Sequence, residues 1–437
     1  MRRMRDRSTS DWREGISANG SSIPFVPAAR TLPKGLLAFL LTFVVLADFS
    51  AATLTLDDRT PSRPVQLSSD VLPPTSALWS SPLGTGTSFS LSGNLSDLVV
   101  DPIRPRAYAA DRLNDRVYAL DLNNGSVLAS IPVRAGPTAL AIAPAGNTLY
   151  VGHGANRSII EVDLNSLAVV RTFETTFLTW RIVAPDDMTL VATTHDDQWS
   201  GEYPYVLNAS TGAVFQRLCW SQLACNKFYQ DTLVAASSDG SWLFLADSLM
   251  YPTALYSYER NVGGNVSGWS YAGDNRGPGW GLSGGATDLA VSPDNLYLYL
   301  TSAQTSLLKL RTSDFTLVKS FGAFRRSSAL VVSPSGDRVA MSPGDASIHV
   351  FDEFGKPLWR IGMTAPVTRL RITARGDRFV AVAGASTVEV VSAYLPTPPF
   401  QLTEIARAWL LYSALVATGV EGLVLAVLVI RQLRHRR

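Results

Sequence analysis

The sequence predicts an all-β fold: a seven-bladed β-propeller with an N-terminal signal or anchor segment and a C-terminal transmembrane helix. Three observations support this prediction. A pattern of short strands and turns recurs about every forty residues, an apolar run lies near each end of the chain, and basic residues flank both runs. With 437 residues, 46% apolar and 17% charged, the chain can bury a large core.

The repeat is clearest in residues 138–173. Strand-like segments at 138–144, 148–152, 159–163 and 169–173 are separated by turns, without helical periodicity. Seven such units bury both faces of every sheet when they close into a ring. The last unit offers strands only up to 388–392, so we expect its outer strand to come from 77–83. The innermost strands are expected to start near Asp97, Thr138, Thr179, Asp231, Thr287, Ala329 and Thr368.

The segment 143–151, APAGNTLYV, resembles the YVTN-type β-propeller repeat, a relative of WD-repeat and quinoprotein-like propellers. The resemblance extends over 77–395. It implies a propeller fold but no particular activity, because such propellers serve binding, scaffolding and catalysis alike. The Trp-Asp pair of WD repeats is absent, and Gly-His occurs once, at Gly152-His153. The regular tryptophan motifs of quinone-cofactor propellers are also missing, so we expect no cofactor.

The first apolar run, 36–47, has the length of a signal-peptide core and is too short for a full membrane span. Basic residues precede it, and the small residues Ser50, Ala51 and Ala52 follow it, as a cleavage site requires. The basic region before the run is unusually long for a signal peptide. Cleavage and retention as an anchor therefore both stay open.

The second apolar run, Trp409 to Ile430, covers about 33 Å as a helix, enough to cross the hydrocarbon core. Glu421 costs roughly 2.5 to 3.5 kcal/mol near the helix centre, whereas the Leu, Ile and Val residues contribute roughly 4 to 7 kcal/mol. The Arg-rich end, 431–437, marks the cytoplasmic side. The body is therefore expected on the extracellular or lumenal side of a single-pass protein, or of a two-pass protein if the N-terminal segment is retained.

These signals divide the chain into one large domain and membrane-associated segments on either side of it. The predicted parts are a basic cytoplasmic or signal-preceding segment (1–34), a signal peptide or signal anchor (35–54), a linker (55–76), the propeller (77–395), a linker (396–408), the transmembrane helix (409–430) and a basic cytoplasmic tail (431–437).

Cys219 and Cys225 are the only cysteines, and both belong to the part expected outside the cytoplasm, where disulfides form. Two thiols alone make a poor zinc site. We therefore predict a disulfide that stabilises its short loop by about 2 kcal/mol. Asn-x-Ser sequences in the same part predict N-glycosylation. The acceptors are Asn94, Asn124, Asn156, Asn208 and Asn265.

Chemical motifs are few. The sequence contains no nucleophile elbow, phosphate-binding loop or metalloprotease motif, and its net charge of +2 gives no basic face for nucleic acid. The densest polar cluster is His195-Asp196-Asp197 with Trp199, which could bind a divalent cation or act as acid and base; a solvated loop is the simpler interpretation. It follows the second strand of its unit. Asp111, His153 and Asp247 are expected in equivalent loops on the same face of the ring.

Two long spacings insert extra residues above the third to fifth units. The first insertion holds the cysteine pair with Trp220, Phe228 and Tyr229, and the second holds Trp280. Aromatic side chains on restrained loops make good interface anchors, although packing onto the ring is an equal alternative. We therefore expect a membrane-displayed binding or scaffold module for a protein or glycan partner. The alternative is a propeller enzyme, lactonase-like or another metal-dependent hydrolase, that uses polar loops around the channel.

Overall fold

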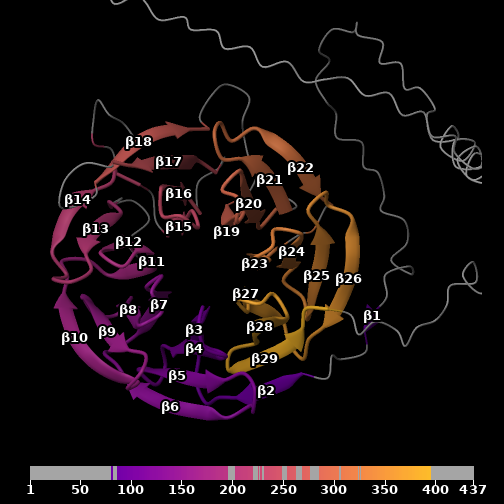
Figure 1. Cartoon of the computed structure of the whole chain (residues 1–437), viewed down its shortest axis with the longest axis horizontal. Coiled ribbons are helices and arrows are strands. Elements are labelled where there is room, and N and C mark those ends of the chain that lie inside the picture. Colours follow the sequence, from indigo (N-terminus) through magenta and orange to yellow (C-terminus); the bar gives the residue numbers. More distant parts are fainter. Residues whose placement is uncertain are drawn as a thin grey trace, which may run out of the picture. The chain divides into compact units, whose positions relative to one another are not determined.

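The computed structural model describes residues 80–81, 86–194, 202–219, 225, 227–228, 231–248, 253–261, 268–275, 285–304, 307–322, 324 and 326–394. All of them belong to one compact unit of the chain, Val71–Arg437. They form seven antiparallel sheets of four strands around a central channel, one of which gains a fifth strand, and they contain no helix (Figure 1). The predicted all-β, seven-bladed propeller is therefore confirmed for this part of the chain.

The first strand of each blade lines the channel. These strands begin within two residues of the predicted positions, because each repeat marks its first strand with an apolar stretch that ends before a tight turn. Each of them contacts the corresponding strand of the next blade, and the last contacts the first, so the ring is closed. The innermost strands are β3 (Leu95–Val100), β7 (Pro137–Ile142), β11 (Thr179–Asp186), β15 (Leu233–Ala236), β19 (Ala286–Val291), β23 (Ala329–Val332) and β27 (Val367–Ile372).

The second and third strands form the interior of each blade, because neighbouring blades cover both of their faces. The second strands are β4 (Arg106–Asp111), β8 (Thr148–His153), β12 (Thr189–Thr194), β16 (Trp242–Ala246), β20 (Tyr297–Ser302), β24 (Arg338–Ser342) and β28 (Arg378–Ala383). The third strands are β5 (Arg116–Asp121), β9 (Ser158–Asp163), β13 (Tyr205–Asn208), β17 (Leu255–Arg260), β21 (Leu307–Arg311), β25 (Ser347–Asp352) and β29 (Thr387–Ser392).

The outermost strands form the rim of the ring and are the most exposed. In the fifth blade, four of the five residues of the outer strand are exposed, whereas every residue of β12 is buried. The outer strands are β6 (Val127–Pro132), β10 (Ala168–Glu174), β14 (Val214–Arg217), β18 (Trp269–Asp274), β22 (Leu317–Phe321), β26 (Pro357–Gly362) and, in the last blade, β2 (Thr87–Ser90).

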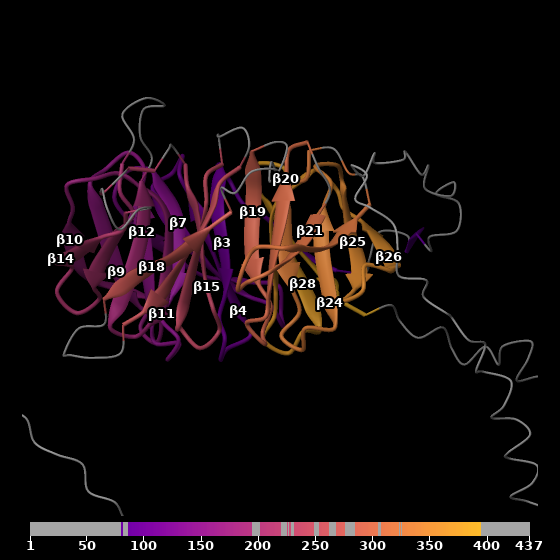
Figure 2. The ribbon, with the colours of Figure 1, turned by 90° about the horizontal axis from the view of Figure 1, so that it is seen from above.

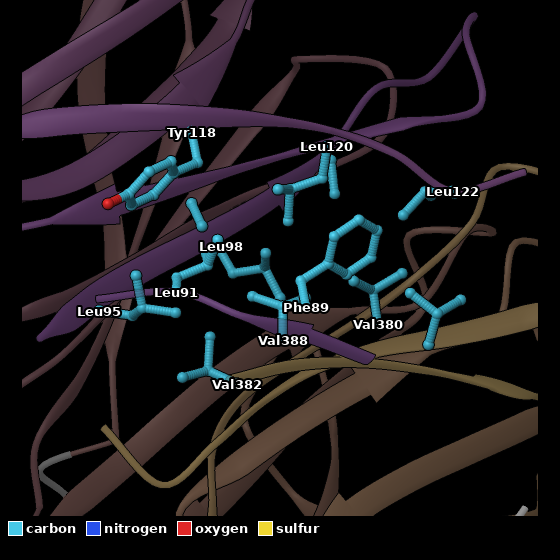
Figure 3. Close-up of a cluster of buried hydrophobic side chains, with 13 residues drawn as sticks. Phe89, Leu91, Leu95, Leu98, Tyr118, Leu120, Leu122, Val380, Val382 and Val388 are labelled. Atoms are coloured by element: carbon cyan, nitrogen blue, oxygen red, sulfur yellow. The ribbon is translucent and has the colours of Figure 1, made fainter. Parts of the chain in front are cut away.

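Hydrophobic clusters fill the space between adjacent blades. The cluster in Figure 3 joins Phe89 and Val388 of the last blade to Leu98 and Leu120 of the first. Leu98, Leu120 and Val388 are fully buried, so blade-to-blade packing supplies the apolar burial that a single four-stranded sheet lacks.

The strand that closes the ring differs from the predicted one. Residues Thr87–Ser90 pair antiparallel with β29 and complete the last blade, as the missing outer strand requires. The prediction placed this strand at 77–83, which was wrong: β1 (Ser80–Ser81) instead pairs in parallel with β26 as a fifth strand of the sixth blade. Phe89 explains the choice, because the alternation of β2 carries this side chain into the cluster between the last and first blades.

The two faces of the ring are defined by strand direction. We call the face on which the innermost strands begin the front face and the opposite one the back face; Figure 2 shows strands running between them. Antiparallel order returns each second strand to the front, where Asp111 ends β4 opposite Leu95. The chain enters and leaves the ring on the back face, because Ser392 ends β29 opposite Arg378, the first residue of β28.

Both apolar runs, 36–47 and 409–430, lie outside the described residues. Within those residues, no helix has the length and apolar character needed to cross a membrane. The signal segment, the transmembrane helix and the linkers beside them stay predictions from the sequence.

Candidate functional site at the channel mouth

A shared β-bulge shapes the front rim of the channel. In β3, β7, β11, β19 and β27, the pairing with the second strand shifts near the front end of the innermost strand. At two of these bulges, the hydroxyls of Ser96 and Thr138 donate to the carbonyl oxygens of Pro137 and Thr179, each at 2.6 Å. The bulges thus connect the front end of one blade to the next.

The residue directly after the bulge is charged in four of these five strands and is Ala139 in the other. Asp97, Arg181 and Asp288 line a cavity of about 370 Å³ inside the channel, and Arg181 and Arg369 line its front mouth. The same position in the repeat therefore places opposite charges around one channel, each supplied by a different blade.

The two aspartates of the channel, Asp97 and Asp288, accept hydrogen bonds from neighbouring blades. Oδ2 of Asp97 accepts a hydrogen bond from the backbone N–H of Leu140 in the next blade, and Oδ2 of Asp288 accepts one from Leu330, both at 2.9 Å. Oδ1 of Asp97 also lies 3.5 Å from Nε of Arg369. Asp97 thus bonds to a backbone group on one side and balances positive charge on the other.

Arg371 completes the charged set on the last blade. Its guanidinium lies 3.6 Å from Oδ1 of Asp97, the atom that also faces Arg369. One carboxylate oxygen therefore serves two guanidinium groups. The positive charge of this pair exceeds the negative charge that faces it.

Arg181 forms no ion pair with any described residue. Its guanidinium lies 4.7 Å from the centre of the Trp180 ring and donates a hydrogen bond to the Trp180 carbonyl oxygen at 3.5 Å. Burial lowers the pKa of the Arg181 guanidinium to about 10, and the positive charges of Arg369 and Arg371 add to this effect. Nearby carboxylates oppose the shift without cancelling it. The site therefore favours an added negative charge next to Arg181.

The front mouth opens into a cavity of about 660 Å³. Its wall includes Trp180, Arg181, Arg326 and Arg369, with Asp231 as an acidic member. Asp231 and Arg326 lie two and three residues before the strands that begin the fourth and sixth blades, and both adopt left-handed backbone conformations, with φ of 58° and 65°. Such strained conformations in residues other than glycine concentrate at functional sites. Among its described residues, the mouth thus combines net positive charge with left-handed backbone conformations.

The sequence predicted Asp111 in a loop on one face of the ring. In the structure its side chain is fully buried. Its Oδ1 accepts hydrogen bonds from the backbone N–H groups of Asn94 and Leu113, at 2.9 and 3.0 Å. Burial alone would raise the pKa of Asp111, but the hydrogen bonds from Asn94, Asn114 and Leu113 outweigh burial and hold this pKa below its usual value. Asp111 therefore organises the front turn of the first blade.

Like Asp111, His153 and Asp247 form hydrogen bonds within their own blades. Nδ1 of His153 donates to the carbonyl oxygen of Ser158 at 3.0 Å, and burial lowers the pKa of this imidazole. Asp247 accepts hydrogen bonds from the hydroxyls of Thr232 and Tyr256, at 3.1 and 3.0 Å. All three predicted loop residues therefore reach the front end of their blades, as expected, but their side chains point into the fold.

The predicted disulfide is confirmed between Cys219 and Cys225. The Tyr258 hydroxyl donates to the Cys219 carbonyl oxygen at 2.9 Å, which holds this loop against the fourth blade. Phe228, predicted as an interface anchor, is only 2% exposed and packs edge-on against Tyr256. Its aromatic ring thus follows the packing alternative, because it belongs to the cluster of buried apolar side chains between the third and fourth blades.

The other predicted site residues lie outside the described part of the chain; they are His195, Asp196, Asp197, Trp199, Trp220, Tyr229 and Trp280. Among the residues that are described, no three histidine, cysteine, aspartate or glutamate side chains gather as a set of metal ligands. Of the predicted glycosylation acceptors, Asn124 is exposed on a back-face turn, and glycosylation stays a prediction. Asn94, Asn156 and Asn208 are partly buried, and Asn265 lies outside the described residues.

The arginines of the channel were missed in the sequence. A signal was present, because aligning the repeats at their innermost strands places Arg181 and Arg369 in the same column as Asp97 and Asp288. A charged residue at a channel-lining position of a propeller repeat is a site signal that is independent of any motif.

Comparisons with known proteins support the fold. No family model matches the chain, and no curated protein matches it. Among solved structures, the hydrazine synthase of Kuenenia stuttgartiensis is similar to this chain, with 14% sequence identity and a TM-score of 0.52. The similarity covers 70% of this chain and 96% of that chain. At this identity the similarity shows the fold and carries no information on activity, so the YVTN-type resemblance rests on its motif.

Proposed function

We propose that this protein is a binding or scaffold module whose front face receives a protein or glycan partner on the extracellular or lumenal side of a membrane. A rigid ring with polar loops on one face is a frequent architecture for binding. The observation that carries the proposal is the position of the chain ends: β2 begins and β29 ends on the back face.

The chain leaves the ring toward the proposed anchor from the back face. Residues 393–408 connect β29 to the apolar run at Trp409, a reach of roughly 50 Å when extended. With this anchor in a membrane, the chain leads to it from the back face, and the front face carries no connection to the anchor. The channel mouth belongs to the front face, where we expect the partner to bind.

A bulky label on each face tests the proposal. Gln304 follows β20 on the front face, and Leu296 precedes the same strand on the back face, where it is 59% exposed. The chain's own cysteines are joined to each other. Gln304→Cys and Leu296→Cys therefore each add one thiol, which a maleimide-polyethylene glycol can modify in the full-length protein.

Binding would be measured on arrays of glycans and of extracellular proteins, before and after labelling. We expect the label at position 304 to abolish partner binding and the label at position 296 to leave it intact. The reverse pattern would place the binding surface on the back face. If the unlabelled protein bound no glycan and no protein on the arrays, the proposed binding module would lose its support.

A further inference from the structure

We propose that the front mouth of the channel binds a small oxyanion, a carboxylate or phosphate group, between Arg181, Arg326 and Arg369. This site is separate from the proposed binding or scaffold function, and it is argued from the channel residues alone. It concerns a small ligand, and it holds whether or not a protein or glycan covers the front face.

The first argument is the charge around the channel. Arg181, Arg326 and Arg369 line the mouth, and Asp231 is the acidic residue that faces them there. The aspartates deeper in the channel, Asp97 and Asp288, offset part of this positive charge, since Asp97 also faces Arg369 and Arg371. Among the described residues that line the two cavities, four arginines therefore face three aspartates, which leaves one positive charge in excess.

The second argument is the state of Arg181. This side chain lines both the inner cavity and the mouth, so it sits where the two spaces meet. Trp180 supports its guanidinium from one side. Burial and the positive charges of Arg369 and Arg371 lower the pKa of Arg181, and Asp97 and Asp288 offset this shift only in part. An oxyanion beside Arg181 would stabilise its buried positive charge.

The third argument is the chemistry of the guanidinium group. Its planar fork of N–H donors matches the paired oxygens of a carboxylate or phosphate, and several arginines converging on one cavity are a common way to recognise such groups. A cavity of about 660 Å³ lies within the range of small-molecule sites. The excess of positive charge among the described channel residues would also raise the local concentration of anions.

Thermal unfolding of the purified full-length chain tests the inference. Inorganic phosphate and citrate would each be titrated against sodium chloride at equal ionic strength and constant pH. We expect a saturable rise in Tm with at least one of the two oxyanions, because a ligand that binds only the folded state stabilises it. The anion with the larger saturable effect identifies whether phosphate or carboxylate is preferred.

Variants locate the effect at the mouth. Arg326→Gln alters an exposed side chain, and Arg181→Gln alters the central one; each should weaken anion binding about tenfold, the loss expected for one charge-assisted hydrogen bond. Arg311→Gln is the matched control, because Arg311 is exposed at the back end of β21 and lines neither cavity. It should bind like the wild type.

The inference is overturned if neither anion produces a saturable shift. It is also overturned if Arg326→Gln and Arg181→Gln retain wild-type affinity. If near-ultraviolet circular dichroism shows that Arg181→Gln does not fold, the anion affinities of Arg181→Lys and Arg326→Gln decide instead. Loss of binding in Arg326→Gln supports the mouth site, and wild-type affinity in both excludes it.

Discussion

Oδ1 of Asp97 lies 3.5 Å from Nε of Arg369, and this contact joins the innermost strand of the first blade to that of the last. The carboxylate is almost completely buried, while its two arginine neighbours keep part of their surface in the channel. The contact therefore belongs both to the closure of the ring and to the charge balance of the channel.

Replacing Asp97 should weaken the closed ring. Asp97→Asn removes the charge that faces two guanidinium groups, and we expect a loss of about 2 kcal/mol in unfolding free energy, reduced from the usual cost of breaking a buried pair because the arginines are partly hydrated. Denaturant unfolding of the full-length protein measures this loss. Asp345→Asn is the control: it breaks an exposed pair with Arg360 and should cost less than about 1 kcal/mol. Equal losses in both variants would contradict the role assigned to Asp97.

Asp111 should make part of the stability depend on pH. Its pKa in the folded protein lies below the usual value, so its hydrogen bonds stabilise the fold above about pH 4 and are lost as the pH falls through the folded pKa. Asp111→Asn should lower the unfolding free energy by about 1 to 2 kcal/mol at pH 7. The difference from the wild type should shrink toward pH 3. Unfolding measured between pH 7 and 3 decides this, and a difference independent of pH would refute it.

The closing strand should depend on one aromatic side chain. Phe89 is 4% exposed and packs with Leu98 and Leu120 of the first blade. Phe89→Ala should lower the unfolding free energy by about 3 to 5 kcal/mol. Phe215→Ala, on the outer strand of the third blade, should cost about 1 kcal/mol because this ring is 37% exposed. Similar costs for the two variants would show that β2 contributes little to closure.

The membrane topology can be tested without reference to the fold. Trp409 to Ile430 and the Arg-rich end predict that a tag after Arg437 faces the cytoplasm. Protease added to intact cells should digest the propeller and leave the tag. Digestion of the tag from outside would reverse the predicted orientation.

The sequence predicted the innermost strands well and the closing strand poorly, for a physical reason. Each innermost strand belongs to a local repeat, so its position can be recognised from its own residues. By contrast, β2 has four residues and takes its partner from β29, at the other end of the propeller sequence. Only the register with β29 and the pocket for Phe89 select it over the segment that contains β1.

The candidate site, too, could be predicted from the sequence only in part. Burial of Asp111 and Phe228 follows from contacts made after folding, and a polar or aromatic residue in a loop gives no sign of them in the sequence. Arg181 likewise gains its significance from Arg369 and Asp97, which come from other blades. The repeat register indicated where such residues would lie, but the charge balance among them required the structure.

The position of β29 also determines how the protein would bear a load. This strand pairs with β28 on one side and with β2 on the other, and it runs from the front face to the back. Tension between a partner on the front face and an anchor beyond residue 394 would therefore act along the strand axis. Such a force must shear two ladders of hydrogen bonds together instead of peeling them apart one by one, which makes the attachment mechanically strong.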